Sequence, residues 1–368
     1  MKKRIIPLFF ALIYSSLVLG TIDPNPKKDY VPNVIPPSPT ASELGRYGQI
    51  PVGMFTGTAQ VSIPLYTLTS SQLSIPISLS YSSNGIKVDQ VASWIGLGWS
   101  LNAGGVITRT IRGQEDEKTS FPVPSSIEDN TYETHWFLNY VWDDMLDTEP
   151  DLFSFNFAGY TGSFIMHLTE EQEFEIVLVP FQNLKVDFEY DLGELDSFII
   201  TAPDGIQYFF GGDYIETSLL ASSGYNCSRS YDGDKRTSWY LYQIVHPYGD
   251  TINFSYASNY FSYSTGISQT ITRAFSIQSC GGNQCDQPSQ TDCKQVITAK
   301  TWHLTEIEAS NGRKIIFSSS KDREDLGDCK LNYFSVIDPL NNLYRTYSFS
   351  YFFSYNNEST PKSQTLIY

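Results

Sequence analysis

The chain has 368 residues and a formal net charge of −16, with few charged residues (17%) and many aromatic ones (15%). This negative charge argues against nucleic acids and anionic membrane surfaces as partners, because both attract proteins that carry a positive field. The aromatic content argues against a disordered chain and favours aromatic-rich strands, and the length allows one large core or two domains.

The N-terminus has the layout of a secretory signal peptide. Three basic residues after Met1 precede an apolar run over residues 5–19, and Val18 and Gly20 are small enough to flank a cleavage site. The run is shorter than the roughly 20 residues that a membrane span needs. We therefore predict a signal peptide over residues 1–20, export through the inner membrane, and a secreted or cell-surface protein without a membrane span after signal cleavage. The proline-rich residues 21–48 predict an extended tether.

Residues 49–113 predict a β module of paired strands. From Leu73 to Tyr81 every odd position is apolar, which is the period of a strand with one buried face. Asn84-Gly85 predicts a hairpin turn into a return strand at residues 86–88. A turn at residues 102–105 and a strand at residues 106–112, rich in β-branched side chains, complete the module.

Between these strands, residues 94–99 alternate large apolar residues with glycines. Glycine in a strand marks a bend or the close approach of another backbone, so the pattern predicts a strand pressed against a neighbouring sheet. We expect the key residues of the module to be structural: indoles that fill a tight layer, and glycines and an asparagine that allow close approach and turns. They are Trp94, Gly96, Gly98, Trp99, Asn102, Gly104 and Gly105.

This module carries a resemblance to a known family. Residues 85–113, GIKVDQVASWIGLGWSLNAGGVITRTIRG, resemble the N-terminal region of secreted RHS/YD-repeat proteins of the Bacteroidetes. GLGWSL followed by an I-T-R strand is distantly similar to the first part of the Tc toxin B component. Residues 39–68 and 149–164 fit the same family in the same order. The resemblance implies a β-shell that encloses or displays a variable C-terminal domain, often a toxin; the sequence lacks the later YD-repeat consensus, the autoproteolytic aspartates and such a cargo domain.

Residues 114–150 interrupt the strand pattern. The acidic stretch at residues 114–126 predicts a polar surface loop, and residues 131–146 predict a short helix without a clean apolar stripe.

From residue 151 to residue 368 the chain repeats a theme of strand, turn and strand. Turn residues centre near positions 160, 204, 249, 312 and 341, and each turn separates two apolar or aromatic segments. The irregular spacing indicates a recurring hairpin and not a strict tandem repeat. One hairpin cannot bury its apolar face alone. We therefore predict an all-β fold in which successive antiparallel hairpins form extended sheets, the beginning of an RHS/YD-type β-shell that is truncated relative to the family.

The five cysteines all lie in the second half of the chain. In an oxidising compartment we expect a local disulfide among Cys280, Cys285 and Cys293, which share one loop. The odd count leaves at least one thiol free or intermolecular. Zinc is disfavoured for this loop, because it has no C-x-x-C motif and no nearby histidine.

We identify no catalytic residues, no metal ligands and no cofactor site from the sequence. The four histidines are far apart, G-x-S-x-G is absent, and the acidic segments 114–117 and 322–325 lack the ligand spacing of a calcium loop. The glycine doublets, including Gly211-Gly212, are not phosphate loops. A carboxylate pair suited to glycoside hydrolysis stays open among Asp143, Asp144, Glu149 and Asp151.

The sequence therefore predicts a non-enzymatic, structural N-terminal part of an exported RHS/YD-repeat protein. Its expected partners are a downstream or separate RHS/YD-repeat segment with its cargo domain, and the surface of neighbouring cells. Two alternatives stay open, a free-standing adhesion or carbohydrate-binding β protein and a secreted hydrolase with an unrecognised site.

Overall fold

The computed structural model divides into two compact units, Met1–Ile50 and Pro51–Tyr368, and all described residues belong to the second. The predicted signal peptide and tether, residues 1–48, lie outside the described part and stay predictions. The described residues are 59–83, 91–119, 127–128, 130–142, 145–146, 148–169, 171, 173–223, 233–272, 289–355 and 361–367.

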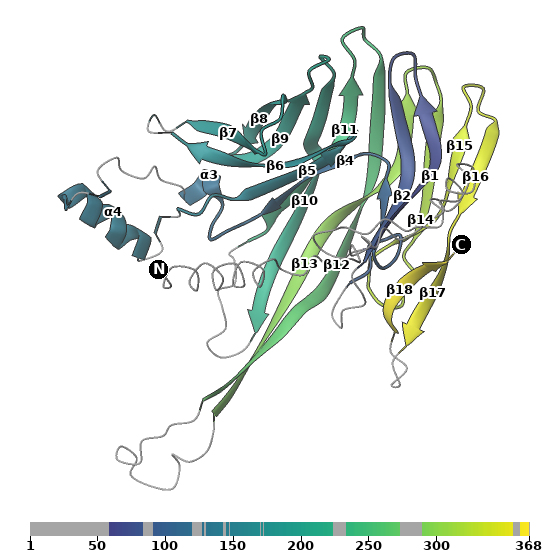
Figure 1. The fold of residues 1–368 in the computed structure, drawn as a ribbon. Helices are drawn as coiled ribbons and strands as arrows, with labels where there is room; N and C mark the ends of the chain where they lie inside the picture. The colour runs from purple at the N-terminus through teal and green to yellow at the C-terminus, as the bar shows by residue number, and fades with distance from the viewer. Residues whose placement is uncertain are drawn as a thin grey trace, which may run out of the picture. The chain divides into compact units, whose positions relative to one another are not determined.

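This part of the chain is almost entirely antiparallel β-structure, which confirms the predicted fold class (Figure 1). A small sheet has the order β1-β2-β3, with β1 at Ala59–Thr69, β2 at Ser74–Ser83 and β3 at Trp99–Asn102. Two helices, α3 at Asp116–Thr119 and α4 at Tyr132–Trp142, lie where we expected the loop and the helix. β17 (Ser350–Tyr355) and β18 (Pro361–Ile367) form a separate pair.

The other 13 strands form one large sheet with the path β16-β15-β14-β13-β10-β11-β4-β5-β6-β7, to which β12, β9 and β8 are attached. The strands are β4 (Gly105–Thr110), β5 (Leu152–Phe157), β6 (Tyr160–Leu168), β7 (Phe174–Val179), β8 (Lys185–Asp191), β9 (Glu194–Thr201), β10 (Gln207–Ser223), β11 (Lys235–Val245), β12 (Thr251–Thr272), β13 (Ser289–Ala309), β14 (Lys314–Ser320), β15 (Lys330–Ile337) and β16 (Leu343–Ser348).

All five predicted hairpins are present, as β5–β6, β9–β10, β11–β12, β13–β14 and β15–β16. Their formation is local: alternating apolar residues flank turns with glycine, asparagine or aspartate, which accept tight-turn geometry. In β5, for example, Phe153, Phe155 and Phe157 are buried while the residues between them are more exposed. These phenylalanines therefore point to one face, toward the core.

The hairpins do not follow one another across the sheet in chain order. Along one edge β10 pairs with β9 from Gln207 to Gly211 and then with β13 from Thr217 to Ser223. Its pairing with β11 extends from Gln207 to Ser218. Gly211 and Gly212 take positive φ values of 92° and 59°, and the pairing register with β11 shifts between Phe210 and Ile215. The glycine doublet thus lets β10 bend and change partner, as bulges do in natural sheets.

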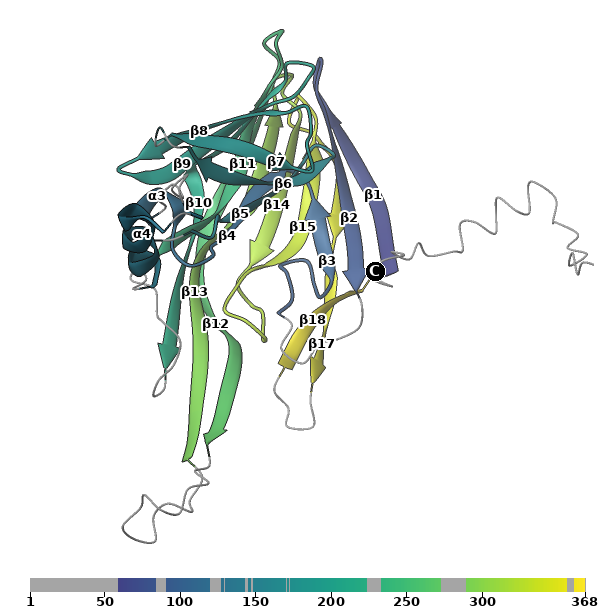
Figure 2. The ribbon, with the colours of Figure 1, turned by 60° about the vertical axis from the view of Figure 1, so that its left-hand side comes forward.

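β4 links the expected N-terminal module to the hairpin series. It pairs with β5 along Gly105 to Thr110 and with β11 along Val106 to Thr108. β12 and β13 are the longest strands described, with 22 and 21 residues, and they extend past the ends of their neighbours (Figures 1 and 2).

The prediction of a strand over residues 94–99 is wrong. Ser93 forms an isolated bridge to Gly96, the chain turns twice, and β3 begins only at Trp99. Gly96 and Gly98 have φ values of 129° and 74°, so these glycines serve turns that side chains would strain. The predicted turn at Asn84-Gly85 and the return strand at residues 86–88 lie outside the described residues.

Both sheets contribute to one core. Ile77 and Leu79 of β2 are fully buried in the same cluster as Trp239 of β11 and Phe198 of β9. The ring centroids of Phe198 and Trp239 are 5.1 Å apart in an edge-to-face arrangement, which is a favoured geometry for aromatic pairs. Aromatic side chains therefore form a large part of this core.

A polar joint around Asp250 fastens the β1–β2 turn to the large sheet. Asp250, in the β11–β12 turn, accepts hydrogen bonds from Ser70 Oγ at 2.6 Å, from the backbone N of Gln72 at 2.6 Å and of Leu73 at 3.0 Å, and from Ser310 Oγ. Burial raises the pKa of Asp250, but these hydrogen bonds outweigh burial and hold it well below its usual value. The carboxylate therefore stays ionised and joins three turns that are far apart in sequence.

Candidate functional site

The candidate site is a cavity of about 660 Å³ between the small sheet and the large sheet. This volume lies within the range of small-molecule pockets, about 300 to 1,000 Å³. β2 and β3 form one wall, β11, β12 and β13 the other, and the β3–β4 turn closes one side. Its lining residues include Ile75, Ser78, Ser80, Trp94, Asn102, Gly104, Gly105, Tyr240, Tyr256, Thr301, Trp302, His303 and Asp328.

Aromatic side chains of the large sheet line the cavity, and the protein itself satisfies their polar atoms. Tyr256 donates its hydroxyl proton to the carbonyl of Leu241 at 2.7 Å, and Trp302 Nε1 donates to the carbonyl of Ile215 at 2.8 Å. Burial raises the pKa of Tyr256, so its hydroxyl stays protonated at neutral pH. These rings are thus held in place by backbone groups.

Glu216 of β10 binds the polar side chains on this wall. Its Oε2 accepts hydrogen bonds from Tyr240 at 3.0 Å and from Thr301 at 3.1 Å, and its Oε1 accepts from Ser238 at 3.3 Å. Burial, followed by the charge of Glu216, raises the pKa of Tyr240. The wall thus contains a carboxylate whose oxygens are already engaged, which favours a structural role for it.

A cluster of three residues with metal-binding side chains adjoins the cavity. His303 Nε2 lies 2.7 Å from Asp328 Oδ1, which also accepts a hydrogen bond from Asn259 Nδ2 at 2.9 Å. The ligand atoms of His303, Asp328 and Cys329 all lie within 4.8 Å of one another. Within the described residues, no other group of three His, Cys, Asp or Glu side chains is close enough to hold an ion.

Burial and neighbouring charges act differently on the two acidic members of this cluster. Burial raises the pKa of Asp328, but the hydrogen bond and charge of His303 and the bond from Asn259 outweigh burial and leave it below its usual value. Burial, followed by the charge of Asp328, raises the pKa of the Cys329 thiol. At neutral pH the cluster therefore holds a carboxylate beside a protonated thiol.

A second polar centre surrounds Arg109 of β4. Its side chain is fully buried and donates to Asp151 Oδ2 at 2.7 Å and to Glu117 Oε1 at 2.9 Å. Burial lowers the pKa of Arg109, but the hydrogen bond and charge of Glu117, together with Asp151, outweigh burial and raise it. Burial raises the pKa of Asp151 despite Arg109. This arginine therefore neutralises two carboxylates inside the protein.

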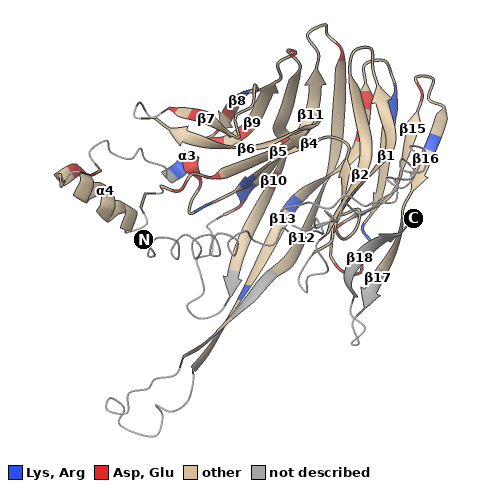
Figure 3. Ribbon diagram, viewed as in Figure 1, with Lys and Arg blue, Asp and Glu red and all other residues tan. Residues whose placement is uncertain are grey.

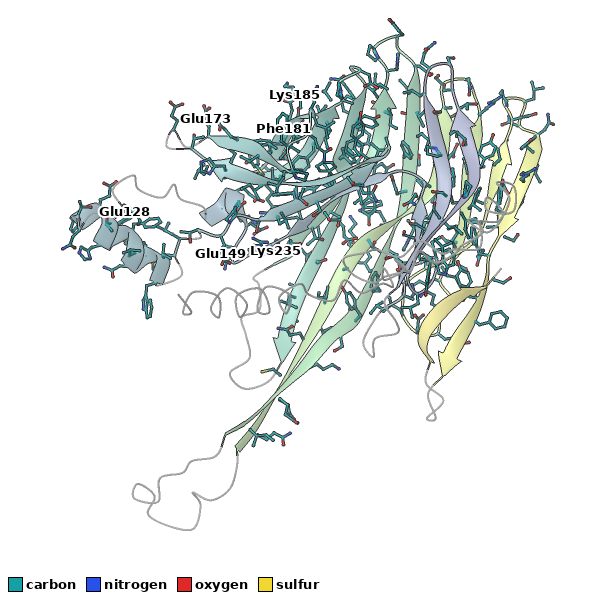
Figure 4. All side chains as sticks on the ribbon, in the orientation of Figure 1. Glu128, Glu149, Glu173, Phe181, Lys185 and Lys235 are labelled. Carbon is teal, nitrogen blue, oxygen red and sulfur yellow. The ribbon has the colours of Figure 1, made fainter. Side chains whose placement is uncertain are left out.

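The prediction that residues 114–126 form a polar surface loop is wrong at its start. Glu115 and Asp116 are each only 2% exposed. Lys235, at the start of β11, donates a hydrogen bond to Glu115 at 2.5 Å and is labelled in Figure 4. Figure 3 shows the charged residues of α3 in colour. The acidic segment is thus drawn into the protein by buried cations. Residues 120–126 lie outside the described part.

The structure brings four of the seven expected structural residues, Trp94, Asn102, Gly104 and Gly105, to the cavity. Trp99 lies on β3 with its ring centroid 5.0 Å from that of Tyr81, and Gly96 and Gly98 lie in the preceding turns. Cys293 is disulfide-bonded. Cys280 and Cys285 lie outside the described residues, so the pairing within this loop stays a prediction.

Sequence reasoning missed the cluster of His303, Asp328 and Cys329. His303 is 25 residues from Asp328, and no spacing rule joins the two. Of the expected carboxylates, Asp151 is fully buried against Arg109, Glu149 is exposed, and Asp143 and Asp144 lie outside the described residues. No helix in the described part is long and apolar enough to span a membrane.

The comparisons with known proteins give limited likeness. No protein-family model matches the chain, and no curated protein matches it in sequence. Among solved structures, the chain is similar to the TcdB2-TccC3 complex, with a TM-score of 0.44 and 13% identity over 87% of this chain and 15% of that chain. The chain thus spans about one seventh of that protein's length.

Two further solved structures are similar at the same level. The N-terminal domain of the effector protein SpvB from Salmonella typhimurium strain LT2 has a TM-score of 0.43 and 12% identity, over 84% of this chain and 97% of that one. The Tc holotoxin pore of Photorhabdus luminescens has a TM-score of 0.41 and 13% identity, over 84% and 14% of the two chains. At these values the likeness carries no argument about function.

Proposed function

We propose that this chain is a non-catalytic structural part of an exported RHS/YD-repeat protein, and that its sheets form the N-terminal portion of a β-shell. The observation that carries the proposal is the place of β4. This strand comes from the segment that resembles the family, and it lies between β11 and β5 inside a sheet of 13 strands. The resembling residues are therefore an integral part of the extended sheet that such a shell requires.

The free edge at β16 supports growth of this sheet. In the described residues β16 pairs with β15 alone, and all its side chains except that of Tyr347 are exposed. An unpaired edge strand presents backbone N–H and C=O groups that can bind another strand. The proposed partner is a downstream or separate RHS/YD-repeat segment with its cargo domain, and the exported assembly would meet neighbouring cells.

The test begins with the DNA that follows the codon for Tyr368, where we expect a continuation or a neighbouring gene that encodes YD repeats. The encoded segment is then mixed with this chain, and amide hydrogen exchange is measured. Exchange in β16 should slow, because a new strand protects its outward amides. β5, in the interior of the sheet, serves as the reference and should not change. An unrelated downstream gene and unchanged exchange in β16 would contradict the proposal.

A carbohydrate-binding protein is the second candidate, and the aromatic wall of the cavity favours it. Trp94, Tyr240, Tyr256 and Trp302 line a space that also contains Asn102. Aromatic faces beside amide groups are a combination that suits sugars. Screening the purified chain on a glycan array, with Trp302→Ala as the matched variant, tests this candidate. No binding by the unmodified chain would remove it.

The absence of an enzymatic activity stays a prediction. The buried Asp151 argues against a role in hydrolysis, because its carboxylate binds Arg109 and two backbone amides, of Arg112 and Asp116, instead of facing a pocket. A screen of the purified chain against chromogenic glycoside and ester substrates checks the prediction, and turnover would contradict it.

A further inference from the structure

The cluster of His303, Asp328 and Cys329 combines three types of metal ligand at one place. An imidazole nitrogen, a carboxylate oxygen and a thiol sulfur lie within 4.8 Å of one another. These are the ligands that zinc binds in proteins, at about 2.0 to 2.3 Å from the ion. Ligand atoms at these distances around a tetrahedral ion lie about 3.3 to 3.7 Å from one another. Small side-chain movements, which include a slight separation of His303 Nε2 from Asp328 Oδ1, would therefore complete the coordination.

The cluster is held in place before any ion binds. The side chains of His303 and Asp328 are 7% and 9% exposed, and Asn259 fixes the Asp328 carboxylate by a hydrogen bond of 2.9 Å. The ring of Trp94 lies against the His303 ring, with their centroids 5.2 Å apart. Such outer contacts orient metal ligands and reduce the entropy that binding would otherwise cost.

The nearby cation does not occupy the place of a metal ion. Arg323 Nη1 is 3.9 Å from Asp328 Oδ2, which is beyond a direct hydrogen bond. Its guanidinium instead binds Asp325 at 2.8 Å and the backbone carbonyl of Ala92 at 3.0 Å. Arg323 therefore serves the loop around Asp325 and leaves the ligand atoms facing one another.

The state of the thiol distinguishes this cluster from an ordinary pair of buried polar residues. Cys329 is a free cysteine, whereas Cys293 is in a disulfide. An unpaired thiol is open to oxidation, and metal coordination is one way to protect it. The thiol is half-buried and close to both other ligands.

We propose that His303, Asp328 and Cys329 bind one zinc ion through three protein ligands. Zinc binds His303 through Nε2, so the proton that Nε2 shares with Asp328 Oδ1 moves to Nδ1 and the imidazole stays neutral. The Cys329 proton leaves to solvent, because zinc binds thiolate. His303 and Asp328 line the cavity, so a water molecule or an oxygen of a bound ligand there supplies the fourth ligand. This site goes beyond the proposed scaffold function and does not depend on it.

Cobalt(II) provides the direct test, because it replaces zinc in such sites and absorbs light. The mature chain is purified without reductant, so that the disulfide of Cys293 stays closed, and is freed of metal with a chelator. Adding cobalt(II) should produce visible bands of a tetrahedral ion and a near-ultraviolet charge-transfer band from the thiolate. Zinc should abolish both, with one ion bound per chain by elemental analysis.

Two variants assign the ligands. C329S should lose the charge-transfer band, and H303Q should weaken zinc binding by at least about 10-fold. H135Q, which changes an exposed histidine on α4, is the matched control and should bind as the unmodified chain does. Circular dichroism of each metal-free variant shows whether it is folded.

Thermal unfolding of the unmodified chain tests the proposal even if one of the variants does not fold. Zinc at 100 times its dissociation constant stabilises the native state by about 2.7 kcal/mol through mass action, so the melting temperature of the unmodified chain should rise. No rise in a folded, unmodified chain, or a charge-transfer band that persists in folded C329S, would overturn the proposal. Weak octahedral cobalt spectra without a thiolate band, which indicate surface carboxylates, would overturn it as well.

Discussion

Asp250→Ala should loosen the small sheet from the large sheet. The substitution removes the acceptor for four hydrogen bonds, from Ser70, Gln72, Leu73 and Ser310. The hydrogen bond from the amide of Leu73 is buried, so its loss should cost the full value for a bond to a charged group, about 1.5 to 3 kcal/mol of stability. Water can replace the carboxylate at the three part-buried bonds, which together add about 1 kcal/mol. The expected loss is therefore about 2.5 to 4 kcal/mol.

The assay is urea unfolding of the purified chain, followed by tryptophan fluorescence, together with hydrogen exchange of the β1–β2 turn. Asp204→Ala is the matched control, because Asp204 lies in another hairpin turn, is exposed, and accepts a bond from Ile206 within that turn. We expect it to cost about 0.5 kcal/mol or less. Equal losses for the two variants, with unchanged exchange at Leu73, would refute the role of the joint.

The same carboxylate gives a pH dependence with a defined sign. The folded state holds the pKa of Asp250 below its usual value of 3.8. The ionised carboxylate therefore stabilises the fold fully above pH 3.8, and this stabilisation is lost as the pH falls toward the folded-state pKa. The stability difference between the unmodified chain and Asp250→Asn should thus be largest at neutral pH and shrink below about pH 4. A difference that stays constant down to pH 2 would contradict the assignment.

Two further pairs of substitutions test packing and buried charge. Gly105→Ala should cost about 1 to 3 kcal/mol in urea unfolding, because its Cβ would lie 2.5 Å from Phe157 Cβ, whereas Gly104→Ala, with its nearest atom at 3.5 Å, should be nearly neutral. Similar losses for the two would count against the close approach of β4 and β5. Arg109→Met should lower the free energy of unfolding by about 3 to 5 kcal/mol, because it leaves the buried carboxylates of Asp151 and Glu117 without their cation. The control is Arg112→Met, which changes an exposed arginine. Equal unfolding midpoints for the two variants would contradict the role of the buried network.

Local patterns predicted the strands well. The five hairpins after residue 151 follow from alternating apolar residues around short turns, and such pairing involves neighbours in sequence. The segment at residues 94–99 shows where this reasoning failed. Large residues alternating with glycines have the period of a strand, yet Gly96 and Gly98 take positive φ values and make turns. The pattern of residue sizes does not distinguish these two uses of glycine.

The candidate site was almost invisible from the sequence. Trp94, Asn102, Gly104 and Gly105 were expected to matter as packing residues, and the structure places them around a cavity. The cavity's other wall comes from strands more than 130 residues further along the chain. The buried acids Glu115 and Asp116 were missed for the same reason, because one of their partners, Lys235, is 120 residues from Glu115.

The sequence by itself determined the antiparallel strands, their turns and the faces that they bury, because these depend on side chains within a few residues of one another. Only the tertiary structure decided the order of the strands, the insertion of β4 between β11 and β5, and the meeting of His303 with Asp328. The physical reason is that edge pairing uses backbone hydrogen bonds that every strand offers equally. The choice among partners therefore rests on how all the apolar faces and buried charges are satisfied together.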